Sequence, residues 1–150
     1  MPQSLSNLLV HVVFSTKNRE PWLVPALRPR VHGYLAETVR NMGGLYPHVG
    51  GVADHVHLGL NLSRAGSVSE LVEAIKCSSS RWIKTQGKGL AGFAWQRGYA
   101  AFSVGQEGWD SLGTYITNQE EHHRTRTFAD EYRELLRHHR VAFDERYVWD

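Results

Sequence analysis

Apolar residues recur along the chain in two spacings, one typical of strands and one typical of helices. The segment 8–14 is short, β-branched and bounded by polar residues, which predicts a buried strand. Segments 45–51 and 55–62 are also strand-like and are separated by only three residues, which favours an antiparallel hairpin. Segments 93–95 and 99–104 are predicted to be extended as well.

Apolar residues three and four positions apart predict four helices. The first covers 27–42 and ends at a pair of glycines. A capping box at 67–70 begins the second, whose apolar stripe continues to residue 83. Asp110 is predicted to cap a third helix, and Thr127 starts a fourth.

The resulting order, βαββαβ followed by helices, is typical of an α+β chain with a ferredoxin-like sheet. We expect one domain over residues 1–150, with two helices on one face of a four-stranded sheet and the other face open to a ligand or a second subunit. The chain contains no apolar run long enough for a membrane helix, and its N-terminus lacks the basic start of a secretory signal. We therefore expect a soluble, cytoplasmic protein.

Charge is distributed unevenly, although the formal net charge is only +2. Residues 1–106 contain 11 Lys or Arg against 5 Asp or Glu, whereas residues 107–150 contain 6 against 10. Within the basic part, cations alternate with aromatic residues, a pattern that suits a phosphate backbone and unpaired bases but equally suits a solvated helix face over an aromatic core. The candidates for phosphate contacts are Lys17, Arg19, Lys76, Arg81, Lys84 and Arg97.

Two histidines in the second strand of the predicted hairpin are candidate metal ligands. Side chains alternate along a strand, so His55 and His57 point to the same side. Such a pair also occurs by chance on a strand surface. The single cysteine, Cys77, excludes an internal disulfide and a cysteine-based zinc site.

Tyr115 and Gln119 lie one turn apart on the third predicted helix. With His55 and His57, the Gln119 amide oxygen would make a mixed nitrogen and oxygen site suited to Mg²⁺ or Mn²⁺, and Tyr115 would stand beside the ion as a nucleophile for phosphoryl transfer. The simpler alternative is that Tyr115 is a core aromatic residue and Gln119 lies in water at the edge of the stripe.

Several segments together resemble a known family, the single-tyrosine HUH transposases of small bacterial and archaeal insertion sequences. The resemblance covers nearly the whole chain and is carried by HVVFSTKNRE, ADHVHLGL, SVSELVEAIKCSSSRWI, FAWQRGYAAFSVG, YITNQEEHH, FADEYRELL and DERYVW. It implies a ferredoxin-like fold, a homodimer with active sites that subunits can share, and a substrate of single-stranded DNA with hairpin ends.

The resemblance also assigns roles to four residues. His55 and His57 match the HUH metal ligands, Gln119 matches the third ligand, and Tyr115 matches the nucleophile. By this analogy Tyr115 attacks a phosphate of the DNA, releases a 3′ hydroxyl and keeps the 5′ end as a phosphotyrosine. Later attack by another 3′ hydroxyl rejoins the strand.

Three alternatives stay open beside an active transposase. A domesticated relative would act on scattered chromosomal palindromes, and a noncatalytic protein of this fold would bind single-stranded nucleic acid without forming a covalent product. A hydrolase of the histidine-triad type is disfavoured because Gly59 stands where a third histidine is expected.

Three further histidines receive other expectations. His122 and His123 are expected near the helix end or the DNA, and His11 is expected to be a satisfied, partly buried strand residue. Asp54 could orient the neighbouring His55 imidazole or could simply belong to a turn.

Overall fold

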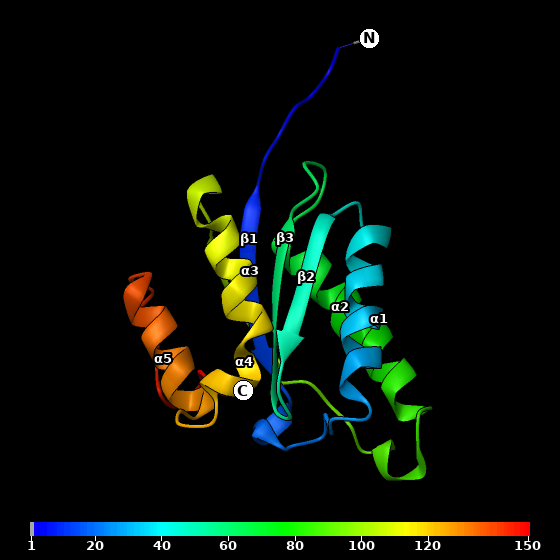
Figure 1. Cartoon of the computed structure of the whole chain (residues 1–150). Coiled ribbons are helices and arrows are strands. Elements are labelled where there is room, and N and C mark those ends of the chain that lie inside the picture. The colour runs from blue at the N-terminus through cyan, green and yellow to red at the C-terminus, as the bar shows by residue number, and fades with distance from the viewer. Residues whose placement is uncertain (1) are drawn as a thin grey trace.

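The computed structural model describes residues 2–150 and contains a four-stranded antiparallel sheet (Figure 1). The strands are β1 (Leu9–Ser15), β2 (Leu45–Gly51), β3 (His55–Asn61) and β4 (Ala100–Ser103), in the order β2-β3-β1-β4. The helices are α1 (Arg28–Asn41), α2 (Val68–Lys84), α3 (Trp109–Thr117), α4 (Gln119–His122) and α5 (Phe128–His138). This order of elements and strands is the ferredoxin-like arrangement, so the predicted fold class is confirmed. Within residues 2–150, none of the helices is long and apolar enough to cross a bilayer.

The larger core lies between the sheet and the pair α1 and α2 (Figure 1). Alternate residues of β1 and β3, including Val12 and Leu58, point to this side and are buried. The Ser67 hydroxyl accepts a hydrogen bond of 3.2 Å from the Glu70 backbone N–H, so the predicted cap does begin α2.

The second face of the sheet is covered by the C-terminal helices, which corrects the expectation of an open face. Val13 and Phe102 pack against Phe128, Tyr132 and Leu136 of α5 in a second buried cluster. The apolar stripe of α5 must be buried somewhere, and this face offers the apolar surface that it needs. Side chains on this face therefore lie inside the protein instead of on its surface.

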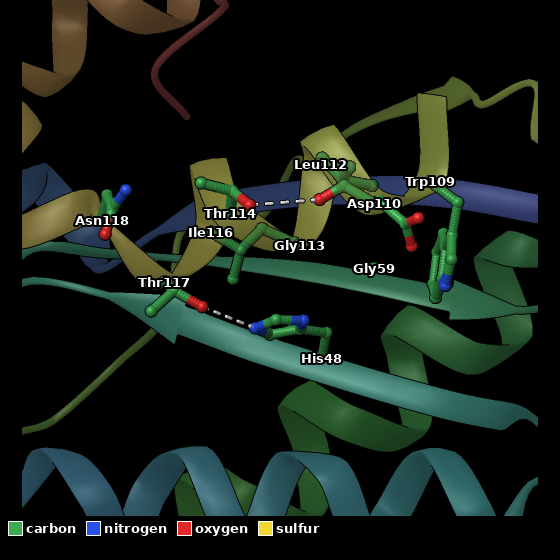
Figure 2. Close-up of a pocket in the computed structure, with 10 residues that line it drawn as sticks. All are labelled: His48, Gly59, Trp109, Asp110, Leu112, Gly113, Thr114, Ile116, Thr117 and Asn118. Atoms are coloured by element: carbon green, nitrogen blue, oxygen red, sulfur yellow. Dashed lines mark hydrogen bonds between the residues drawn. The ribbon is translucent and has the colours of Figure 1, made fainter. Parts of the chain in front are cut away.

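Glycines in the strands let α3 approach the sheet closely. A Cβ atom at Gly50 would lie only 2.3 Å from the Ile116 carbonyl oxygen, and one at Gly59 would lie 3.2 Å from the Ile116 Cδ1 atom. On the β2 flank of α3, His48 Nε2 lies 2.9 Å from the Thr117 hydroxyl, beside a pocket of about 380 Å³ (Figure 2). Gly113 lies against the same imidazole, since a Cβ atom there would be 3.1 Å from His48 Nδ1. These close approaches fix where α3 lies.

Two predicted elements differ from the structure. Gly108 and not Asp110 occupies the cap position of α3, and Asp110 lies in the first turn, where its carboxylate is favourable beside the positive end of the helix. The third predicted helix is interrupted at Asn118, whose backbone leaves helical values before α4 begins. In the predicted strand 93–95, Trp95 makes only a single bridge, to Thr16.

The glycine contacts predict opposite effects of two similar substitutions. Gly50→Ala should lower the free energy of unfolding by about 1–3 kcal/mol, because an added atom forces α3 away from the sheet. Gly33→Ala in α1 is the matched control: a Cβ there meets nothing within 4 Å, so better helix propensity should raise stability by about 0.5–1 kcal/mol. Urea unfolding measures both changes in the free energy of unfolding. Faster hydrogen exchange of the α3 amides would report that α3 has moved away from the sheet. A Gly50→Ala protein as stable as the wild type, with unchanged exchange in α3, would contradict this packing.

Candidate metal centre and the adjacent tyrosine

Two imidazoles of β3 form one side of the candidate centre. His55 and His57 point to the α5 side of the sheet, as the strand alternation predicts, and both are fully buried. Their Nε2 atoms lie 3.2 and 3.1 Å from the same atom, Oε1 of Glu131. The predicted pair of ligands therefore converges on a single point.

The helical segment that follows Tyr115 forms the second side. The Gln119 Oε1 atom lies 3.1 Å from His55 Nε2 and 3.0 Å from His123 Nε2. His123 Nε2 is also 3.0 Å from Glu131 Oε1. His123 lies at the end of α4, as expected, but its imidazole also belongs to the cluster, which was not expected. Tyr115, Gln119 and His123 follow one another at intervals of four residues, which is the sequence signal that could have found it.

Glu131, which sequence reasoning missed, forms the third side. The Thr127 hydroxyl accepts a hydrogen bond of 3.2 Å from the Asp130 backbone N–H and begins α5, which turns Glu131 inward beside Phe128 and Tyr132. Its side chain is only 2% exposed. A carboxylate within the apolar stripe of an amphipathic helix was the available signal, since a buried charge needs partners.

The hydrogen bonds on the outer side of the imidazoles indicate what the centre can hold. His55 Nδ1 lies 2.7 Å from a carboxylate oxygen of Asp54, and His123 Nδ1 lies 2.8 Å from the Arg126 carbonyl oxygen. A carboxylate and a carbonyl oxygen can only accept a hydrogen bond, so the Nδ1 atoms of both rings carry a proton. When such a ring is neutral, its Nε2 atom has a lone pair that points into the cluster. The suggestion that Asp54 orients His55 fits this contact.

When these rings are neutral and protonated on Nδ1, lone pairs of nitrogen and oxygen face one another in a buried space, and either protons on the imidazoles or a bound cation must compensate them. The ligand atoms of His55, His57, His123 and Glu131 all lie within 4.8 Å of one another. Three imidazoles and a carboxylate, with the Gln119 amide oxygen beside them, fit a divalent ion. These residues could therefore hold a metal.

The pKa values follow the same electrostatic logic. Burial lowers the pKa of the His55 imidazole, but hydrogen bonds to Asp54 and Glu131 outweigh burial and raise it to about 8. Burial acts to raise the pKa of the Glu131 carboxyl, yet hydrogen bonds from His123, His55 and His57 hold it well below its usual range. The centre therefore favours an ionised carboxylate together with positive charge next to it.

Tyr115 is joined to the cluster through the second oxygen of Glu131. Its hydroxyl donates a hydrogen bond to Glu131 Oε2, and the Gln119 amide nitrogen donates to the same oxygen at 3.2 Å. Burial and the adjacent carboxylate raise the pKa of the Tyr115 phenol well above its usual range. Tyr115 also lines a pocket of about 710 Å³, beside Arg126. One carboxylate thus connects the candidate ligand imidazoles to a phenol that lines a pocket.

None of the six basic candidates belongs to the cluster. Lys17, Arg81, Lys84 and Arg97 are exposed, and the Arg19 guanidinium lies 4.5 Å from the centre of the Trp149 ring. Lys17 and Arg97 line one pocket of about 500 Å³, and Arg81 and Arg97 line another of about 480 Å³.

Lys76 differs from the other candidates. Its ammonium donates to the carbonyl oxygens of Gln96, Arg97 and Gly98, with the first two bonds at 2.9 and 3.2 Å. Burial lowers the pKa of this amine to about 8. This charge is therefore already used to hold the turn before β4.

Comparison with known proteins gives one family. Residues 4–119 match the model of a family described as transposase, IS200 like. No curated protein matches the chain.

Two solved structures share the fold. One, from Deinococcus radiodurans R1 and described as a transposase, has 22% identity and a TM-score of 0.61, and the match covers 79% of this chain and 98% of that one. The other is a REP-associated tyrosine transposase bound to a REP hairpin, with 15% identity, a TM-score of 0.59 and coverage of 96% of this chain and 90% of that one.

The ligand set predicts a specific response to metal. Mn²⁺ at about 100 times its Kd should stabilise the wild type by about 2.7 kcal/mol, which thermal unfolding detects as a higher Tm. His123→Ala should reduce this increase at the same Mn²⁺ concentration, because a ligand is lost. His138→Ala, which removes an exposed histidine of α5, should leave it unchanged. A full increase in the His123→Ala protein would show that His123 is not a ligand.

Proposed function

Because this chain belongs to the family of IS200-like transposases, we propose that it cleaves and rejoins single-stranded DNA through a covalent 5′-phosphotyrosine on Tyr115. One observation carries the proposal: the Tyr115 hydroxyl is hydrogen-bonded to the Glu131 carboxylate, which also contacts His55, His57 and His123. A phenol held beside a metal-binding cluster, and facing a pocket, suits attack on a phosphate.

In the proposed reaction the Tyr115 oxygen bonds to phosphorus and loses its proton, while the bond from phosphorus to the 3′ oxygen breaks and that oxygen gains a proton. Glu131 and Gln119 orient the participants, since Glu131 accepts the hydrogen bond of the phenol and Gln119 donates to Glu131. A divalent ion held by the imidazoles would polarise the phosphate and neutralise the charge that develops on it.

The ligand set favours Mn²⁺ over Mg²⁺. Two histidines and an amide suit either ion, but the cluster also contains His123. Imidazole nitrogen is a poorer ligand for Mg²⁺ than for first-row transition ions, which bind nitrogen more readily.

Hairpin DNA is the proposed substrate. A REP-associated tyrosine transposase that is bound to a REP hairpin shares the fold over 96% of this chain, which supports the proposal. The proposal includes a homodimer. The Tyr115 hydroxyl already contacts Glu131 of its own chain, so a second copy is not needed to complete the set of residues.

The covalent intermediate gives the first test. Wild-type protein, incubated with Mn²⁺ and single-stranded oligonucleotides from the DNA flanking its gene, should form a protein–DNA adduct that survives denaturing electrophoresis. Tyr115→Phe should form none while retaining its affinity for the same DNA, because only the nucleophilic oxygen is removed. Tight binding without an adduct by the wild type would instead favour a noncatalytic binding protein, and an adduct in Tyr115→Phe would identify another nucleophile.

The basic residues give the second test. Arg81→Ala should weaken DNA binding and reduce the slope of log K against log salt by about one, as expected for one lost phosphate contact. Lys76→Met should leave that slope unchanged and lower the free energy of unfolding by about 1.5–3 kcal/mol, because its bonds to three carbonyl oxygens are lost. Fluorescence anisotropy at several salt concentrations and urea unfolding measure the two effects. If instead Lys76→Met reduced the salt slope and Arg81→Ala did not, Lys76 would be the phosphate contact and Arg81 would not.

A further inference from the structure

His11 contacts the centre from behind. It lies on β1, opposite Gly59 of β3, and its side chain is only 4% exposed. Its Nε2 atom is 2.8 Å from Nδ1 of His57, and the two rings are stacked with centroids 5.1 Å apart. Phe102 and Tyr115 pack around the His11 ring, with centroids at 6.0 and 6.2 Å. The imidazole is therefore held in place on several sides.

The three histidines of the cluster differ in the hydrogen-bond partner of their Nδ1 atoms. His55 and His123 have partners that can only accept a hydrogen bond, a carboxylate and a backbone carbonyl. His57 has another imidazole, whose Nε2 atom either accepts or donates depending on the tautomer. If His11 donates, the neutral His57 ring carries its own proton on Nε2 and cannot bind a metal through that atom.

We infer that His11 is a positioning residue for the metal centre: its Nε2 atom accepts a hydrogen bond from His57 Nδ1 and thereby directs the His57 Nε2 lone pair at the ion. The inference rests on the proposed metal centre and adds a residue to it. Each of the three imidazoles then has an acceptor behind it, as metal-ligating histidines usually do.

The local surroundings explain why this acceptor is neutral. Asp54, behind His55, is 27% exposed at the end of the strand, so water can solvate its carboxylate. His11 is almost fully enclosed, and a second carboxylate buried there would carry a large desolvation cost beside Glu131. A neutral imidazole accepts the hydrogen bond without adding charge.

The test measures binding of Mn²⁺ alone, from the electron paramagnetic resonance signal of the free ion. His11→Leu should weaken Mn²⁺ binding about 10–100-fold, the usual effect of losing such a partner. His11→Gln should bind Mn²⁺ nearly as well as the wild type, because its amide oxygen can accept the same hydrogen bond. Phe102→Leu, which removes packing against His11 and leaves the bond to His57, is the matched control and should keep wild-type affinity.

A second readout separates positioning from a general loss of structure. The Mn²⁺ concentration that gives half-maximal adduct formation should rise in His11→Leu, while the rate at saturating Mn²⁺ stays close to that of the wild type. A lower rate at saturating Mn²⁺ with an unchanged metal requirement would overturn the inference.

Wild-type protein provides a test that needs no substitution. In the Zn²⁺-loaded protein, long-range ¹H–¹⁵N correlation spectra should show a proton on His57 Nδ1 and none on His11 Nε2. A proton on His11 Nε2 would overturn the inference. Failure of the metal centre itself is distinguishable, because His55→Ala would then bind Mn²⁺ as tightly as the wild type. If His55→Ala loses binding and His11→Leu does not, only the role of His11 is wrong.

Discussion

The arrangement of the second face of the sheet depends on the Glu131 carboxylate. Its Oε1 atom contacts the Nε2 atoms of His55, His57 and His123, and its Oε2 atom accepts a hydrogen bond from the Tyr115 hydroxyl. Removing the carboxylate would take away the shared partner of several buried polar groups, which is costly in a low-dielectric interior. A divalent ion would compensate the lone pairs of these groups, so the contacts that join β3, α4 and α5 are also those that could hold a metal.

The position of Tyr115, the proposed nucleophile, is set by backbone packing as well as by hydrogen bonds. Gly50 and Gly59 allow α3 to lie directly on β2 and β3, and His48 contacts its outer flank (Figure 2). This orientation turns Tyr115 toward α5 and the pocket it shares with Arg126. The helix that carries Tyr115 is thus held through its flank on β2, while the phenol contacts Glu131 and lines that pocket.

Local patterns in the sequence predicted much of this. The alternation in β3 was enough to place His55 and His57 on one side, and the four-residue interval related Tyr115 to Gln119. The order of strands and helices was enough for the ferredoxin-like sheet. Each of these inferences uses residues close together in the chain, where the period of the backbone decides the outcome.

The remaining parts depend on contacts between distant segments. Glu131 reaches the cluster only because α5 packs on the sheet through Phe128, Tyr132 and Leu136, and no local period specifies that docking. The role of His11 depends on which residue of β3 lies beside β1, and the strand register decides this. The covered second face is itself a tertiary outcome, which is why the sequence alone suggested an open one.

Anomalous diffraction from crystals grown with Mn²⁺ would show whether these side chains bind an ion. We expect one strong Mn²⁺ peak bounded by His55, His57, His123 and Glu131, with the Tyr115 hydroxyl of the same chain next to that carboxylate. A peak located elsewhere, or a crystal saturated with Mn²⁺ in which these side chains remain uncoordinated, would contradict this expectation.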